Sequence, residues 1–111
     1  MLRSQGAPNL GCMRNFPVER YLPDASEERL RAAVERTCAE AVQLEAEGTP
    51  VRYLSSIVLP EEESCLCIFQ AATAAAVEEV NKRAAFPYAR IVEATVIDSR
   101  SLAETNAEES R

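Results

Sequence analysis

The chain has 111 residues, which is enough for one domain with one hydrophobic core, and its apolar content of 47% is ordinary for a soluble globular protein. No apolar run approaches the ~20 residues that span a bilayer, and the start carries no secretory signal, so we expect a cytoplasmic location. The net charge of −6 disfavours nucleic acid and anionic membranes as partners. The chain also lacks histidine, which removes the commonest general base and transition-metal ligand.

The two ends of the chain show no periodic pattern. Residues 1–15 contain Gly6, Pro8 and Gly11, which predict a flexible arm. Residues 99–111 are mostly polar and predict a flexible tail. A single domain is therefore expected over residues 16–98. The patterned sequence begins just after Met13, which is an alternative natural start to Met1.

A strand and a helix are predicted in the first half of this domain. Residues 16–22 form the strand, which stops at Pro23. Ser26 can cap a helix that runs to about residue 47, and Gly48 can end it. An apolar stripe recurs at helical spacing, with two flanking residues that we also expect in the core. The stripe is Leu30, Val34, Thr37, Ala41 and Leu44, flanked by Ala33 and Cys38.

The second half predicts a hairpin, a helix and a last strand. Residues 51–59 and 64–70 are rich in strand-forming residues and flank an acidic turn at 61–63. Thr73 can cap a helix that ends before Phe86-Pro87, and residues 90–97 form the last strand. The element order β-α-β-β-α-β predicts a ferredoxin-like α+β fold, a four-stranded antiparallel sheet with two helices on one face.

Strand alternation predicts which residues lie on each face of this sheet. The almost wholly apolar set is expected under the helices: Phe16, Val18, Leu54, Val58, Leu66, Ile68, Val92, Ala94 and Val96, with Ser56 as its small polar member. The other set mixes apolar and polar groups: Glu19, Tyr21, Val51, Tyr53, Ser55, Ile57, Cys65, Cys67, Phe69, Ile91, Glu93, Thr95 and Ile97. Exposed, this second face would be a large apolar patch, so we expect it to pack on a second copy as a dimeric α/β barrel.

The charged groups expected on that second face are Glu19 and Glu93. A carboxylate buried among apolar groups would have a raised pKa and could act as an acid or base, or bind a cation. The alternative is an ion pair with an arginine at the sheet edge. The predicted ligand-binding residues are therefore Glu19, Tyr53, Ser55 and Glu93, with hydroxyl groups from Tyr53 and Ser55 beside the two carboxylates.

Cys65 and Cys67 are two residues apart on a predicted strand, so both thiols point the same way. Together they could coordinate a soft metal ion across a dimer axis. The alternative is that they are small buried apolar side chains, which is the usual role of a free cysteine.

Four short segments resemble one family of small bacterial proteins. They are Val18-Glu19-Arg20 with Leu22-Pro23, residues 51–58, Cys67-Ile68-Phe69-Gln70-Ala71, and Ala85-Phe86-Pro87. The family is a domain of unknown function named nickel-binding after a characterised member, and the resemblance covers about residues 16–98. It implies a ferredoxin-like fold, a dimeric barrel and nickel as a candidate cofactor. Ser55 stands where family members often have histidine, so a metal site would use Cys67, Cys65 and Glu19, doubled by symmetry.

Three functions are consistent with these features. The first is a homodimeric, non-enzymatic protein that holds a small ligand or metal ion between its two sheets. The second is a cofactor-independent enzyme of the monooxygenase or isomerase type, with Glu19 or Glu93 as base and Tyr53 or Tyr21 as hydrogen-bond donor. The third is a regulatory module whose second face only dimerises.

Overall fold

The computed structural model describes residues 13–100, 102 and 103. Its elements follow the order β1 (Arg14–Tyr21), α2 (Glu27–Ala46), β2 (Val51–Leu59), η2 (Pro60–Glu62), β3 (Ser64–Ala71), α3 (Ala74–Ala84) and β4 (Arg90–Ile91). Strand β1 begins two residues earlier than expected. Most of the predicted arm and tail, residues 1–12, 101 and 104–111, lie outside the described residues.

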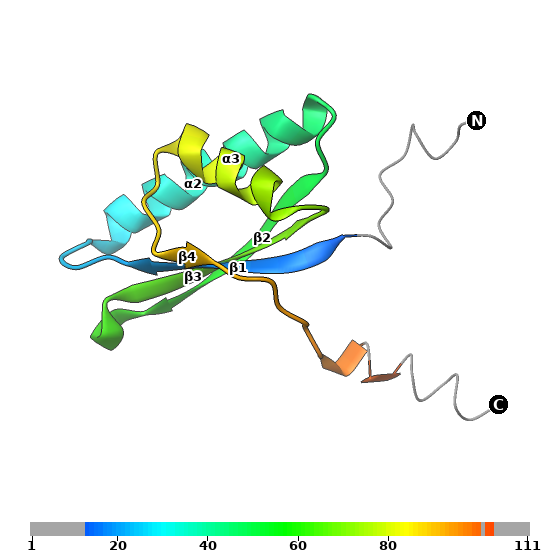
Figure 1. Ribbon diagram of the computed structural model, residues 1–111. Coiled ribbons are helices and arrows are strands. Elements are labelled where there is room, and N and C mark those ends of the chain that lie inside the picture. The colour runs from blue at the N-terminus through cyan, green and yellow to red at the C-terminus, as the bar shows by residue number, and fades with distance from the viewer. Residues whose placement is uncertain (1–12, 101, 104–111) are drawn as a thin grey trace, which may run out of the picture.

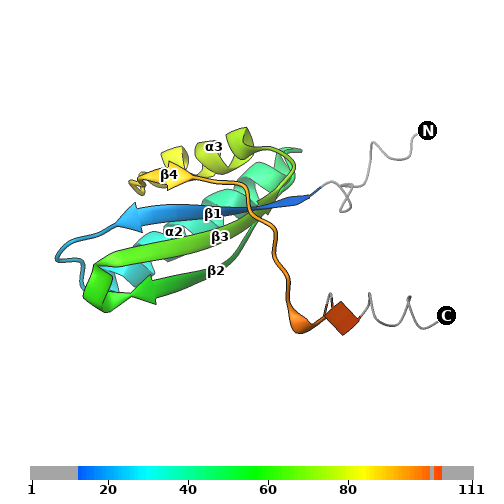
Figure 2. The same ribbon diagram turned by 60° about the horizontal axis from the view of Figure 1, so that its bottom comes forward.

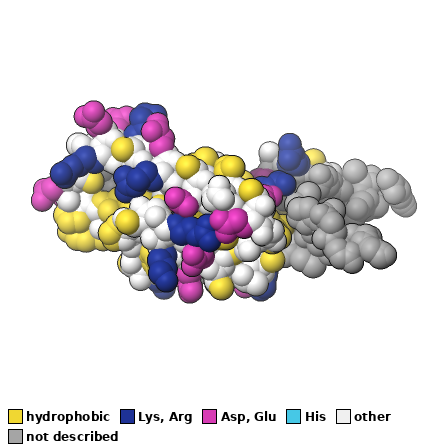
Figure 3. Space-filling view, turned by 90° about the horizontal axis from the view of Figure 1, so that it is seen from above, with side chains coloured by type: hydrophobic (Ala, Val, Ile, Leu, Met, Phe, Trp, Pro, Cys, Tyr) yellow, Lys and Arg dark blue, Asp and Glu magenta, His cyan; other side chains and the backbone are white. Residues whose placement is uncertain are grey.

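The strands form one antiparallel sheet in the order β2-β3-β1-β4. Both helices lie on the same side of the sheet, and the other side is open (Figure 1, Figure 2). The prediction of a ferredoxin-like α+β fold is confirmed. The helix side of the molecule carries Lys, Arg, Asp and Glu side chains of both signs, interspersed over its surface (Figure 3). Within the described residues, no helix combines the length and apolar character that crossing a membrane requires.

The helix ends follow the predicted capping residues. The Ser26 hydroxyl accepts from the Arg29 backbone N–H at 3.1 Å, and Thr73 caps α3 in the same way. Gly48, with φ of 109°, follows α2 in a conformation that favours glycine. Cys38 is exposed, so its predicted place in the core is wrong. It lies one residue, about 100° of helical rotation, beyond buried Thr37, which takes it off the stripe.

The predicted faces of β2 and β3 need correction. Cys65, Cys67 and Phe69 are buried on the helix side, while Leu66 and Ile68 face the open side. The pattern could not decide this because both sets of alternating residues are apolar. In β2 a bulge shifts the register between Tyr53 and Ser55. It makes Leu54 the extra residue and brings Val51 and Tyr53 to the helix side, whereas both were expected on the open face.

Strand β4 is shorter than the expected 90–97 and its phase is reversed. Ile91 pairs with Val18 and so lies on the helix side, although the open face was predicted. Beyond Ile91 the chain keeps backbone hydrogen bonds to β1, from Val92 to Pro17 and from Ala94 to Asn15. The isolated bridge between Asn15 and Ala94 puts Ala94 on the open side. Ile91 and Val92 are both apolar, so alternation alone did not fix which one faced the helices.

Candidate functional site

The open face of the sheet is the first candidate site, because it is apolar and exposed. Tyr21 is 63% exposed, Ile57 50% and Leu59 40%. Pro17, Leu66 and Ile68 lie between them and are only partly buried. The sequence predicted a second face of mixed apolar and polar residues, and Glu19, Tyr21, Ser55 and Ile57 do lie on it. Seven of the predicted members instead lie on the helix side: Val51, Tyr53, Cys65, Cys67, Phe69, Ile91 and Glu93.

Glu19 lies on this open face and is held by Arg90 of the neighbouring strand. The two residues are register partners, and the Arg90 guanidinium donates to both Glu19 carboxylate oxygens at 2.7 and 3.2 Å. This hydrogen bonding lowers the Glu19 pKa, although partial desolvation opposes it. Glu19 is therefore a paired carboxylate, as in the ion-pair alternative. Ser55 is exposed on the same side of the sheet.

Glu93 is not on the open face. Its carboxylate accepts from Arg14 at 3.2 Å. Arg14 alternates in phase with buried Phe16, so this exposed pair lies toward the helix side at the sheet edge. The structure consequently separates Glu93 from Glu19 and Ser55, with which it was expected to form a ligand-binding set.

Cys65 and Cys67 do lie together, with their Sγ atoms 3.8 Å apart, but both are buried beneath the helices. Burial raises the pKa of the Cys65 thiol to about 11, and the neighbouring Cys67 adds to this shift. Glu19 points to the opposite side of the sheet from both thiols. The three predicted metal ligands therefore do not converge within one chain.

Arg20 is the central residue that sequence reasoning missed. It is only 2% exposed, and its Nε donates to Cys67 Sγ at 3.3 Å. Its other nitrogens donate to Asn81 Oδ1 and to the Phe86 and Pro87 carbonyls, and the guanidinium lies 3.6 Å from the Phe86 ring centroid. Among the described residues, no carboxylate pairs with it. The sequence carried one signal of this burial: Arg20 lies two residues after Val18 and four after Phe16, so strand alternation puts it on the same face as these core residues.

Tyr53 and Ser56 form a second polar pair on the helix side. Their hydroxyl oxygens are 2.8 Å apart, and the Ser56 hydroxyl donates to Cys67 Sγ at 3.1 Å. The Tyr53 ring meets Phe69 edge-on at 5.7 Å between centroids. Desolvation is the main cause of a raised Tyr53 pKa, so its hydroxyl stays protonated near neutral pH.

The donor set of one chain does not fit a nickel site. In the part of the chain that the structure describes, no group of three or more Cys, Asp or Glu side chains could hold a metal ion. The Cys65–Cys67 thiol pair has the Arg20 cation against it, which opposes a second cation at the same place. Nickel prefers imidazole or thiolate ligands, and the chain supplies no imidazole.

Comparisons with known proteins identify the family. Residues 16–94 match the family model described as nickel responsive protein SCO4226-like. The chain belongs to this family. The crystal structure of SCO4226 from Streptomyces coelicolor A3(2) is similar, with a TM-score of 0.61 at 18% sequence identity, covering 76% of this chain and 99% of that one. That likeness shows the shared fold. No curated protein matches the sequence.

Proposed function

We propose that this chain is a homodimeric, non-enzymatic binding protein whose two open faces pack together and hold a small ligand between them. The observation that carries the proposal is the exposed apolar open face, centred on Ile57, Leu66 and Ile68. Monomeric soluble proteins rarely leave such a contiguous patch in water. Two sheets packed face to face would bury it.

A second copy is the occupant that the chemistry of this face favours. A twofold interface uses the same patch from both partners, so the patch must complement itself. The apolar centre satisfies this requirement on its own. The Glu19–Arg90 pair supplies one charge of each sign, so a symmetry mate can meet it without an unpaired charge.

The polar groups on the open face suit binding better than acid–base catalysis. Glu19 and Ser55 could orient a small molecule between the sheets. A general base works best with a pKa near the working pH, but the pairing with Arg90 lowers the Glu19 pKa. Glu93 is in an ion pair elsewhere. The enzyme alternative therefore has less support than ligand binding.

Nickel is the second candidate ligand, and the family description is what favours it. A site between two sheets would draw on Glu19 from each copy, since the thiols lie on the other face. Such an oxygen-only site would first have to displace Arg90 from each carboxylate.

The dimer is tested by sedimentation equilibrium of the full chain and two matched variants. Ile57→Asp places a charge on the open face. Val42→Asp is the control, because it places the same charge on the outer surface of α2, where Val42 is 66% exposed. We expect wild type and Val42→Asp at twice the chain mass of 12.2 kDa, and Ile57→Asp at the single mass. A monomeric wild type, or an Ile57→Asp dimer as stable as wild type, would contradict the proposal.

The identity of the ligand is tested by metal analysis of protein purified without a histidine tag and dialysed against nickel. Stoichiometric nickel in the wild-type dimer, lost in Glu19→Gln, would assign the inter-sheet site to nickel. Absence of retained nickel would remove the metal candidate and leave the small-molecule form of the proposal. Native mass spectrometry of the same dimer would then look for a co-purified small molecule released on denaturation.

A further inference from the structure

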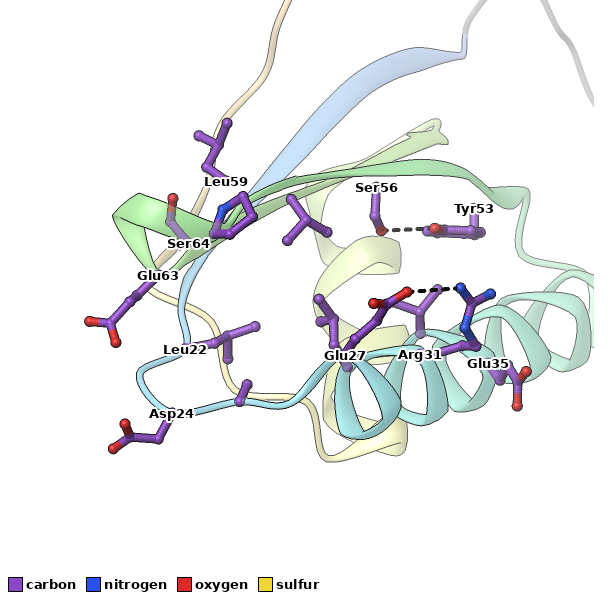
Figure 4. A pocket seen from close by; sticks show the side chains of 15 residues that line it. Leu22, Asp24, Glu27, Arg31, Glu35, Tyr53, Ser56, Leu59, Glu63 and Ser64 are labelled. Carbon is purple, nitrogen blue, oxygen red and sulfur yellow. Dashed lines mark hydrogen bonds and ion pairs between the residues drawn. The ribbon is translucent and has the colours of Figure 1, made fainter.

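A cavity of about 750 Å³ lies on the helix side of the sheet, opposite the open face. It is bounded by the first half of α2, the last residues of β2 and the η2 turn (Figure 4). Its volume is within the roughly 300–1,000 Å³ typical of small-molecule pockets. Leu59 borders both this cavity and the open face, but the cavity contains none of the polar groups Glu19, Ser55 and Arg90 of the proposed inter-sheet site, so the two can be tested separately.

The walls of this cavity are mainly apolar. Leu30 and Val34 line it from α2, and Val58 lines it from β2. Leu30 and Val34 also pack on the core, while Val58 is 44% exposed. These side chains provide a surface for the hydrocarbon body of a ligand.

The polar end of the cavity offers hydrogen-bond acceptors but no free donor. The Ser56 hydroxyl proton is committed to Cys67, whose sulfur also accepts from Arg20. Tyr53 must then donate its own proton to Ser56 across their 2.8 Å contact. The Tyr53 oxygen keeps its lone pairs, so a ligand at this end must bring a donor.

The charges around the cavity also favour a cationic ligand. The residues around it include four with carboxylates, Asp24, Glu27, Glu35 and Glu63, and one with a guanidinium, Arg31. The carboxylates of Asp24, Glu35 and Glu63 point outward from its rim (Figure 4), and Glu63 accepts from the Tyr21 hydroxyl at 3.3 Å. The Glu27 carboxylate points across the cavity toward the Tyr53 and Ser56 hydroxyls (Figure 4). Carboxylates gathered at the rim of a site raise the local concentration of cations there.

Arg31 does not prevent a cation from reaching Glu27. The Arg31 side chain is 71% exposed and the Glu27 side chain 85%, so both lie at the solvent rim of the cavity, and their contact is 3.4 Å long. Exposed pairs of this kind contribute little to stability, so a ligand ammonium can replace the guanidinium at small cost.

We propose that this cavity binds a small organic amine, with its ammonium group between Tyr53 and Glu27 and its apolar body along Leu30, Val34 and Val58. The ammonium donates to the Tyr53 oxygen and takes the place of Arg31 as the donor to the Glu27 carboxylate. The hydrocarbon body covers the apolar wall. An anionic ligand of the same shape should bind more weakly, because the nearby carboxylates repel it and the Tyr53 oxygen has no proton to donate to it.

The test is calorimetric titration of the full chain with three probes that share one ring system: naphthylethylamine, naphthylethanol and naphthylacetate. The amine should bind at least about tenfold more tightly than the alcohol, and the carboxylate more weakly still. Tyr53→Phe should weaken amine binding by about tenfold while leaving alcohol binding less affected. Equal or tighter binding of the carboxylate, or no binding of the amine, would overturn the proposal.

A matched pair of variants on β2 locates the bound amine. Val58→Trp fills the cavity and should abolish binding, whereas Ile57→Trp points to the open face and should leave it unchanged. Both wild-type side chains are about half exposed, so neither change disrupts the core, and circular dichroism checks the fold. Binding that survives Val58→Trp but fails in Ile57→Trp would place the amine between the sheets and refute the cavity assignment.

Discussion

Replacing Arg20 by methionine should destabilise the chain more than any surface arginine substitution. Methionine keeps the apolar stem but leaves two buried oxygen acceptors, Asn81 Oδ1 and the Phe86 carbonyl, and the part-buried Pro87 carbonyl without their donor. Each unsatisfied buried acceptor costs about 1–3 kcal/mol. The substitution also removes the desolvation penalty of a buried charge, which offsets part of this loss in the free energy of unfolding. We therefore expect a net loss of about 3 kcal/mol in the free energy of unfolding.

Urea denaturation followed by circular dichroism measures this loss. With an m-value of about 1.5 kcal/mol/M, the midpoint for Arg20→Met should fall by roughly 2 M. Arg31→Met is the matched control, because Arg31 is exposed and makes one weak ion pair, so its cost should stay below about 1 kcal/mol. If Arg20→Met costs no more than this control, the buried network around Arg20 does not stabilise the fold.

Two further predictions concern the thiols and the acid stability. A Cys12→Ser variant retains Cys38, Cys65 and Cys67. Because Cys38 is exposed, its thiol should react quickly with Ellman's reagent. Cys65 and Cys67 should react only on unfolding; rapid reaction of all three would contradict their burial. The Glu47 pKa is lowered chiefly by hydrogen bonds from Arg83, so this pair contributes stability above the ordinary pKa of 4.5 that is lost as pH falls through the lowered value. The thermal midpoint of Glu47→Gln should accordingly fall less steeply below pH 4.5 than that of wild type, and parallel curves would exclude this role for Glu47.

The order of the elements could be read from the sequence because it depends on local signals. Ser26 and Thr73 mark the helix starts, and Gly48 and Phe86-Pro87 mark where the helices end. Each signal acts within a few residues of the structure that it determines. For this reason the β-α-β-β-α-β order was recovered even though the faces of β2, β3 and β4 were predicted wrongly.

The candidate site was harder to predict because it depends on which face each strand presents. In β3 the set of Cys65, Cys67 and Phe69 is as apolar as the set of Leu66 and Ile68, so alternation gave no preference. Pairing with β1 decides it, since Phe69 lies opposite Phe16 and Cys67 opposite Val18. Register is a long-range property, and a shift of one residue reverses every side chain.

The bulge at Leu54 explains how the two sides of the sheet acquire different chemistry. In a regular strand, residues three apart point to opposite faces, so Tyr53 and Ser56 could not meet. The extra residue brings both to the helix side, where their hydroxyls come within 2.8 Å and form the polar end of the cavity. It also leaves Ser55 and Ile57 on the open face, so the Tyr53 hydroxyl is absent from that face. One inserted residue in an edge strand thus separates an acceptor-rich pocket beneath the helices from a largely apolar surface suited to a second copy.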